Sequence, residues 1–134
     1  MCIVHSSAAM VLLKTRDKAM NIEKAKSYMI KNSRIESMTK TADYIKSLDF
    51  NDESYRFVIA TVRSVKDEFD QCSKLIKSLI ELARVNADDS EFTRMAVHVH
   101  LEEQESMLKV IETVYLFLET CEAIEESKNI KQYN

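Results

Sequence analysis

The sequence of 134 residues contains no glycine, no proline and no tryptophan. The tight turns of β-hairpins favour positive φ angles, which glycine adopts most easily, so a strand-rich fold of this length is disfavoured. Phosphate-binding loops, the dinucleotide fingerprint and the nucleophile elbow all require glycine as well. The chain is therefore expected to be all-helical with short connections, and most nucleotide-dependent enzymes are excluded.

Cysteine is also scarce, and Cys2, Cys72 and Cys121 form no C-x-x-C pair. An odd, widely spaced set suits neither a disulfide framework nor a zinc knuckle, and it is typical of a reducing compartment. The apolar stretch near the N-terminus lacks a basic start and is too short to span a bilayer. We therefore expect a cytoplasmic, soluble protein with no membrane partner, folded as a single domain over residues 1–134.

Charge is nearly balanced over the whole chain, with 19 Lys and Arg against 22 Asp and Glu. Residues 1–50 carry nine basic and five acidic side chains, whereas residues 51–134 carry ten and seventeen. Phosphate binding needs a concentrated basic face, which this distribution does not provide. Nucleic acid is therefore not expected as a partner, and the two parts are expected to attract each other within one fold.

The clearest periodic pattern lies between Tyr55 and Ala83, where apolar residues alternate three and four positions apart. This spacing predicts a long helix over 52–85 with one apolar stripe against a partner helix. Asp49 or Asn51 can cap its first free N–H groups. The stripe consists of Tyr55, Val58, Val62, Val65, Phe69, Cys72, Ile76, Leu79 and Ala83.

The rest of the chain predicts three further helices. Residues 89–126 continue the three-and-four rhythm, and the tail 127–134 has no such pattern and is expected to fray. Residues 22–48 form another helix, which can be kinked near residue 32. A shorter helix is expected at 7–19. Together these elements predict an all-α, up-and-down bundle of three long antiparallel helices plus a shorter N-terminal helix, similar to a four-helix bundle.

The segment "RMAVHVHLEEQE" places His98 and His100 close to several carboxylates. On a helix these histidines point about 200° apart, so they cannot bind one ion from the same face. The zinc motif H-E-x-x-H has its histidines four residues apart, and carboxylate-bridged iron bundles need Glu-x-x-His, which this sequence lacks. We therefore expect no metal site, no cofactor and no catalytic residues.

The spacing of Arg94 and His100 resembles the Arg-x(4–6)-His motif of HEPN-type ribonucleases, which are compact all-helical domains. The resemblance implies an RNA-cleaving enzyme that uses these two side chains. The surrounding sequence is acidic, which is unfavourable for RNA binding. This function is kept as an alternative.

Glu103 interrupts the apolar stripe of its helix. An antiparallel hairpin that turns near residue 87 places Glu103 level with Cys72, and a second hairpin places Asn32 level with Phe69. The two polar interruptions, Asn32 and Glu103, then share one layer, which can fix helix register or line a pocket for a small apolar ligand. The candidate ligand-binding residues of this alternative are Asn32, Phe69, Glu103 and Met107.

The run "VYLFL" at 114–118 is apolar on every side of its helix. Such a segment is either deeply buried or in contact with another subunit, and a homodimer is one arrangement that would cover it. We therefore expect a small interaction protein, a regulator, adaptor or inhibitor without catalytic activity, whose protein partner the sequence does not identify. The candidate interaction surface consists of Val114, Tyr115, Leu116 and Phe117.

Overall fold

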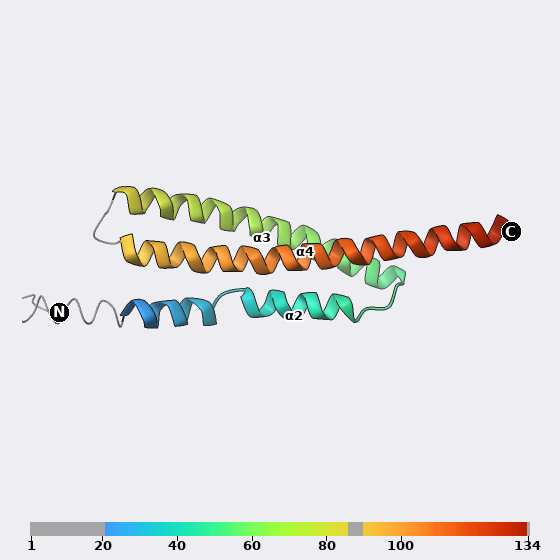
Figure 1. Cartoon of the computed structure of the whole chain (residues 1–134), viewed down its shortest axis with the longest axis horizontal. Helices are drawn as coiled ribbons and strands as arrows, with labels where there is room; N and C mark the ends of the chain where they lie inside the picture. The colour runs from blue at the N-terminus through green and yellow to red at the C-terminus, as the bar shows by residue number, and fades with distance from the viewer. Residues whose placement is uncertain (1–20, 86–89, 134) are drawn as a thin grey trace, which may run out of the picture.

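The computed structural model describes residues 21–85 and 90–133, and the regular elements among them are all helices (Figure 1). The all-α prediction is therefore confirmed, whereas the helix predicted at 7–19 lies outside the described residues. The elements are a helical segment at 21–31, α2 (Ile35–Lys46), α3 (Asp52–Val85) and α4 (Ser90–Tyr133).

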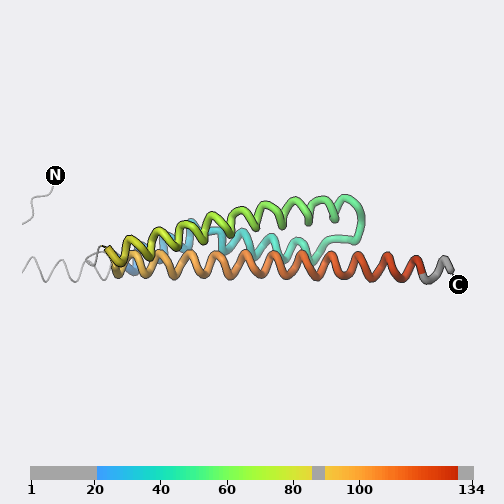
Figure 2. Tube along the Cα trace, turned by 90° about the horizontal axis from the view of Figure 1, so that it is seen from above, coloured from blue at the N-terminus to red at the C-terminus, as the bar shows by residue number. Residues whose placement is uncertain are grey.

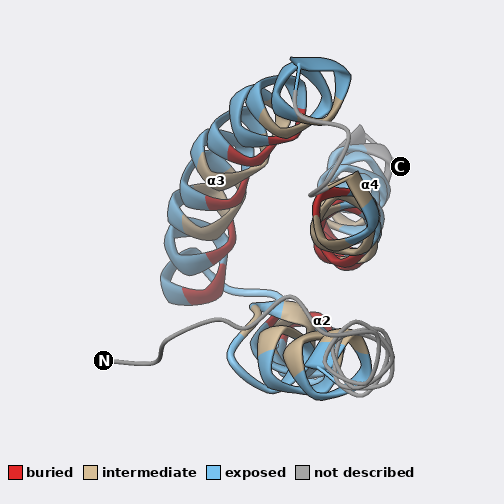
Figure 3. Ribbon diagram, turned by 90° about the vertical axis from the view of Figure 1, so that its left-hand side faces the viewer, coloured by how far each residue is buried: buried red, intermediate tan, exposed pale blue. Residues whose placement is uncertain are grey.

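The three labelled helices run up, down and up beside one another (Figures 1 and 2). The central helix is α4, which packs against both α2 and α3. Seen along the bundle, the buried faces of the three helices turn toward a common centre (Figure 3). This is the up-and-down arrangement that short connections between long helices produce.

The core is apolar and continuous. Burying each of its larger side chains contributes on the order of 1.5–3 kcal/mol, so this cluster supplies the main driving force for packing. Of the apolar stripe predicted on α3, Tyr55 is the one residue that the bundle leaves exposed. The buried cluster consists of Met38, Ala42, Ile45, Val58, Val65, Met107, Val110, Val114 and Phe117.

The kink predicted near residue 32 is confirmed, because residues 32–34 separate two helical segments. At this break, polar side chains add bonds to the last carbonyls of the preceding helical segment, which also accept the backbone N–H groups of Asn32 and Ser33. The amide of Asn32 donates to the Tyr28 carbonyl at 2.9 Å, and the hydroxyl of Ser33 donates to the Ile30 carbonyl at 2.6 Å. Such local bonds compete with helix continuation.

Helix α3 begins after a short loop, and Asn51 is its N-cap. The side-chain oxygen of Asn51 accepts the Ser54 backbone N–H at 2.8 Å, which satisfies one of the free donors of the first turn. Of the two predicted caps, Asp49 and Asn51, the structure therefore uses Asn51. In the same loop Phe50 stacks on Phe117 with ring centroids 4.9 Å apart and covers this end of the core.

Helix α4 continues to Tyr133, past the predicted end at 126. Its C-terminal part extends beyond the loop that joins α2 and α3 (Figures 1 and 2). Residues 122–133 include three Glu and two Lys, which favour helix without needing a packing partner. None of the described helices has an apolar stretch long enough to cross a membrane.

Candidate functional site

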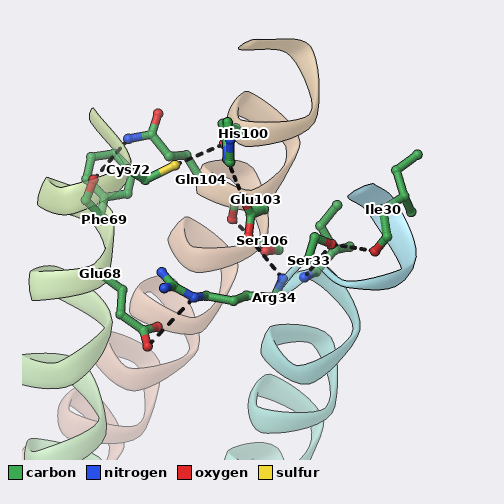
Figure 4. Close-up of polar contacts among 11 residues, drawn as sticks. Ile30, Ser33, Arg34, Glu68, Phe69, Cys72, His100, Glu103, Gln104 and Ser106 are labelled. Atoms are coloured by element: carbon green, nitrogen blue, oxygen red, sulfur yellow. Dashed lines mark hydrogen bonds and ion pairs between the residues drawn. The ribbon is translucent and has the colours of Figure 1, made fainter. Parts of the chain in front are cut away.

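The polar interruption at Glu103 lies where three elements meet. Its carboxylate belongs to α4 and is 7% exposed. One oxygen, Oε2, accepts the backbone N–H of Arg34 at 3.0 Å, and the other, Oε1, is 2.6 Å from Nδ1 of His100 (Figure 4). A buried carboxylate therefore has a partner on each oxygen, which offsets the free-energy cost of removing it from water.

The bond to Arg34 follows from the break in the preceding helix. Residues 32–34 free the first N–H groups of α2, and the N-cap residue Arg34 makes no capping bond with its own side chain. Glu103 supplies the missing acceptor from a helix that is distant in the sequence. A negative charge beside a helix N-terminus is also favoured by the helix dipole.

The thiol of Cys72 on α3 lies on the other side of this site. It donates to the backbone carbonyl of His100 at 3.4 Å. Burial raises the pKa of the Cys72 thiol, the charge of Glu103 raises this pKa further, and the Arg34 guanidinium partly offsets both. In the bundle Cys72 is therefore a protonated, small and largely apolar side chain.

Three further contacts tie the helices together at the same level. Gln104 donates to the Phe69 carbonyl at 3.1 Å and to the Ser73 hydroxyl at 2.6 Å. The guanidinium of Arg34 lies 4.0 Å from the Glu68 carboxylate. The two bonds of Gln104 match the α3–α4 register that the hairpin geometry predicted. All three contacts make this level a polar layer inside an apolar bundle.

The predicted ligand-binding residues lie in different surroundings. Glu103 and Met107 are buried, and Phe69 is half-buried. Asn32 is exposed, and its side chain is bonded to the carbonyl of Tyr28, which is itself 69% exposed. Asn32 thus bonds to the helical turn before the break. The backbone N–H that donates to Glu103 is that of Arg34.

The predicted interaction segment is divided between core and surface. Val114 and Phe117 belong to the buried core, where they are held by the neighbouring helices. Tyr115 and Leu116 are exposed on the outside of α4. Since consecutive residues on a helix are about 100° apart, a four-residue run cannot place all its side chains on one face.

The two histidines point in different directions, as expected from their spacing. His98 is exposed, whereas His100 turns inward to Glu103. Arg94 is exposed on α4. Within one chain, Arg94 is thus on the surface of α4, whereas His100 faces the interior.

The sequence argument missed a cluster that the bundle assembles from two helices. Cys72, His100 and Glu103 each offer a metal-ligating atom, and these atoms lie within 4.8 Å of one another. Two observations could have revealed it: Cys72 was predicted level with Glu103, and His100-x-x-Glu103 is the Glu-x-x-His spacing in reverse. Neither the spacing of the two histidines nor the forward Glu-x-x-His motif indicates this cluster.

Comparison of the chain with protein-family models, curated proteins and solved structures finds no match. The function must therefore be argued from the geometry of this molecule. Two features are available for that purpose, the polar layer around Glu103 and the exposed apolar side chains of α4.

Proposed function

We propose that this protein is a non-catalytic interaction module of the cytoplasm, a regulator, adaptor or inhibitor, that binds a partner protein through the outer face of α4. One observation carries the proposal. Leu101, Leu108 and Tyr115 recur every seven residues on α4 and are 47%, 46% and 51% exposed. We call these three residues the outer stripe.

The outer stripe has the spacing of a helix-packing surface. A repeat of seven residues keeps side chains on one side of a helix, as in coiled coils, and the exposed Leu116 extends this apolar surface. Single exposed apolar residues are common on protein surfaces, whereas a row of large ones in register is typical of an interface. An amphipathic helix is the partner element that fits such a row.

The charges beside the outer stripe favour a basic partner. Glu105, Glu112 and Glu119 are exposed and lie one turn after each stripe residue. A second copy aligned antiparallel about Leu108 would bring Glu105 of one chain against Glu112 of the other, which is unfavourable. We therefore expect an amphipathic helix with Lys or Arg beside its apolar row.

The polar layer supports a structural role for the buried groups. Within the described residues, no buried side-chain nitrogen or oxygen lacks a hydrogen-bond partner. Satisfied networks of this kind fix helix register, as a buried polar residue does in coiled coils. The free thiols of Cys72 and Cys121 suit a reducing cytoplasm.

The test compares two pairs of exposed leucines. Leu101 and Leu108 on α4 are replaced together by serine, and the matched control replaces Leu75 and Leu82, which are also seven residues apart and exposed on α3. Tagged variants are expressed in the native cell, and captured proteins are quantified by mass spectrometry. Capture of the partner should fall at least about tenfold for the α4 pair, which corresponds to about 1.4 kcal/mol of binding free energy, and should persist for the α3 pair.

A photo-crosslinking amino acid at position 108 identifies the surface that is bound. The crosslinked peptide should come from a different protein and should carry an apolar row flanked by Lys or Arg. Equal capture by both leucine pairs would place the interface elsewhere. Crosslinks only between copies of this chain would replace the heterologous partner with a homodimer.

A further inference from the structure

The cluster of Cys72, His100 and Glu103 carries an inference that is independent of the proposed function. The cluster combines a thiol from α3 with an imidazole and a carboxylate from α4, and their ligating atoms lie within 4.8 Å of one another. We propose that these three side chains form a binding site for a divalent transition-metal ion of the zinc type.

The spacing of the three groups is close to that of a bound ion. Bonds of about 2.0–2.3 Å in a tetrahedral site place neighbouring ligand atoms roughly 3.5 Å apart. The widest separation, up to 4.8 Å, must shorten by about 1.3 Å, and the 2.6 Å between Nδ1 of His100 and Oε1 of Glu103 must lengthen by about 1 Å. Side-chain rotation can supply both adjustments. His100 and Glu103 are one turn apart on the same helix, so their backbone positions already suit a shared ion.

The carboxylate of Glu103 is oriented for this role by a group outside the cluster. Its Oε2 is held by the backbone N–H of Arg34 at 3.0 Å, which leaves Oε1 on the side of His100. Metal-ligating carboxylates are commonly fixed by such an outer hydrogen bond, which sets their direction and limits their freedom. The two other candidate ligands are also partly or fully buried, Cys72 at 5% exposure and the His100 side chain at 17%.

The chemical identity of the ligands selects the class of ion. Thiolate and imidazole favour zinc, cobalt and similar ions, whereas magnesium and calcium prefer sites made only of oxygen. Three protein ligands leave one tetrahedral position for water. On binding, the ion takes the place of the proton between Nδ1 of His100 and Oε1 of Glu103, while the imidazole carries its remaining proton on Nε2. The displaced proton and the proton of the Cys72 thiol are both released to solvent.

The site would join elements that are separate in the sequence. The ion would link α3 to α4 directly, and the bond between Glu103 and Arg34 would extend this link to α2. A bound ion at this level should therefore stabilise the whole bundle, because it binds only the folded arrangement of the three ligands.

The experiment uses the full chain with Cys2 and Cys121 replaced by serine, so that Cys72 is the only thiol. Metal-free protein is titrated with Co²⁺ and then with Zn²⁺. We expect one equivalent of Co²⁺ to produce a thiolate-to-cobalt charge-transfer band in the near ultraviolet together with intense visible bands of tetrahedral cobalt. Zn²⁺ should displace the cobalt and raise the unfolding temperature, and a chelator should reverse both effects.

Matched variants assign the ligands. Cys72→Ser, His100→Gln and Glu103→Gln should each weaken binding by about a hundredfold or more, since loss of an outer partner alone costs about 10–100-fold. The controls are His98→Gln and Glu105→Gln, which alter exposed neighbours on the same helix. Circular dichroism verifies that each variant is helical.

Several outcomes would overturn the proposal. A cobalt complex without the thiolate band would exclude Cys72, and this readout needs no change within the site. Equal loss of affinity in the His98 and His100 variants would indicate surface binding. Absence of binding at micromolar Zn²⁺ would show that the cluster is only a hydrogen-bonded layer. None of these results depends on the protein partner of α4, so the two proposals can fail separately.

Discussion

The carboxylate of Glu103 caps the helix that begins after Arg34, although the two residues are far apart in the sequence. Its Oε2 accepts the Arg34 N–H at 3.0 Å. An N-cap acceptor is normally supplied by the side chain just before the helix. Here the Ser33 hydroxyl accepts the Ile35 N–H at 3.3 Å, and the facing helix supplies the acceptor for the Arg34 N–H. The polar interruption of α4 and the break between the segment 21–31 and α2 are therefore two parts of one feature.

Glu103→Ala should lower the free energy of unfolding by about 1–3 kcal/mol, because it leaves the Arg34 N–H without its acceptor. Glu103→Gln should recover most of this loss, since its side-chain oxygen can accept the same bond. Urea denaturation monitored by circular dichroism measures both. The matched control is Glu105→Ala at an exposed position, expected to change stability by about 0.5 kcal/mol or less. Equal effects at residues 103 and 105 would contradict the capping role.

Adjacent residues of α4 should respond very differently to truncation. Met107 is 0% exposed, and Leu108 is 46% exposed. Met107→Ala removes core contacts and leaves a cavity, which should cost about 2–5 kcal/mol. Leu108→Ala should change the free energy of unfolding by about 0.5 kcal/mol or less, because alanine is a good helix former and little buried area is lost. A large loss at Leu108 would mean that the outer stripe serves folding and not binding.

The N-cap of α3 gives a third prediction. Asn51→Ala should lower the free energy of unfolding by about 1 kcal/mol, because the Ser54 N–H loses the acceptor that now lies 2.8 Å away. Asn51→Asp should retain the cap and add a favourable charge at the helix N-terminus. Asp49→Ala, in the same loop, serves as the control and should have a smaller effect. The opposite order would make Asp49 the functional cap.

The comparison of sequence and structure shows which kinds of information a single chain contains. The α3 helix was predicted at 52–85 and found at Asp52–Val85, because three-and-four spacing reports directly which face is buried. The end of α4 was placed too early, because loss of the apolar pattern marks the end of packing and not of helix. Of the outer stripe, only Tyr115 was among the predicted interaction residues. Leu101 and Leu108 were missed, since they lie outside the pattern that locates the core.

The site was harder to predict than the fold. The sequence shows that Glu103 is a polar residue within an apolar stripe. Hairpin geometry then gives its level in the bundle. Its partner is a backbone N–H, which has no sequence signature and is free only because the chain breaks at 32–34. The convergence with Cys72 required the relative rotation of two helices, and periodicity alone does not give this rotation to within one residue.

The last prediction concerns Cys121, which lines an open cleft of about 720 Å³ between the start of α3 and the C-terminal part of α4. Burial raises the pKa of this thiol above its ordinary value. The thiolate is the reactive form, so at mildly alkaline pH the folded protein should be alkylated more slowly at Cys121 than the urea-unfolded chain. Peptide-resolved mass spectrometry after timed iodoacetamide treatment measures this rate separately for each cysteine.

The raised pKa of Cys121 also makes the free energy of unfolding depend on pH. Because the folded-state pKa of Cys121 lies above the unfolded-state pKa, its contribution is complete below the unfolded pKa and is lost as pH rises through the folded pKa. The parent protein should therefore lose more stability than Cys121→Ser between neutral pH and pH values above the ordinary thiol range. The alkylation rate of Cys121 can also be measured as a function of pH. If the folded and unfolded chains gave the same midpoint, the cleft would not bury the thiol. Cys121 would then be available to reagents and partners alike.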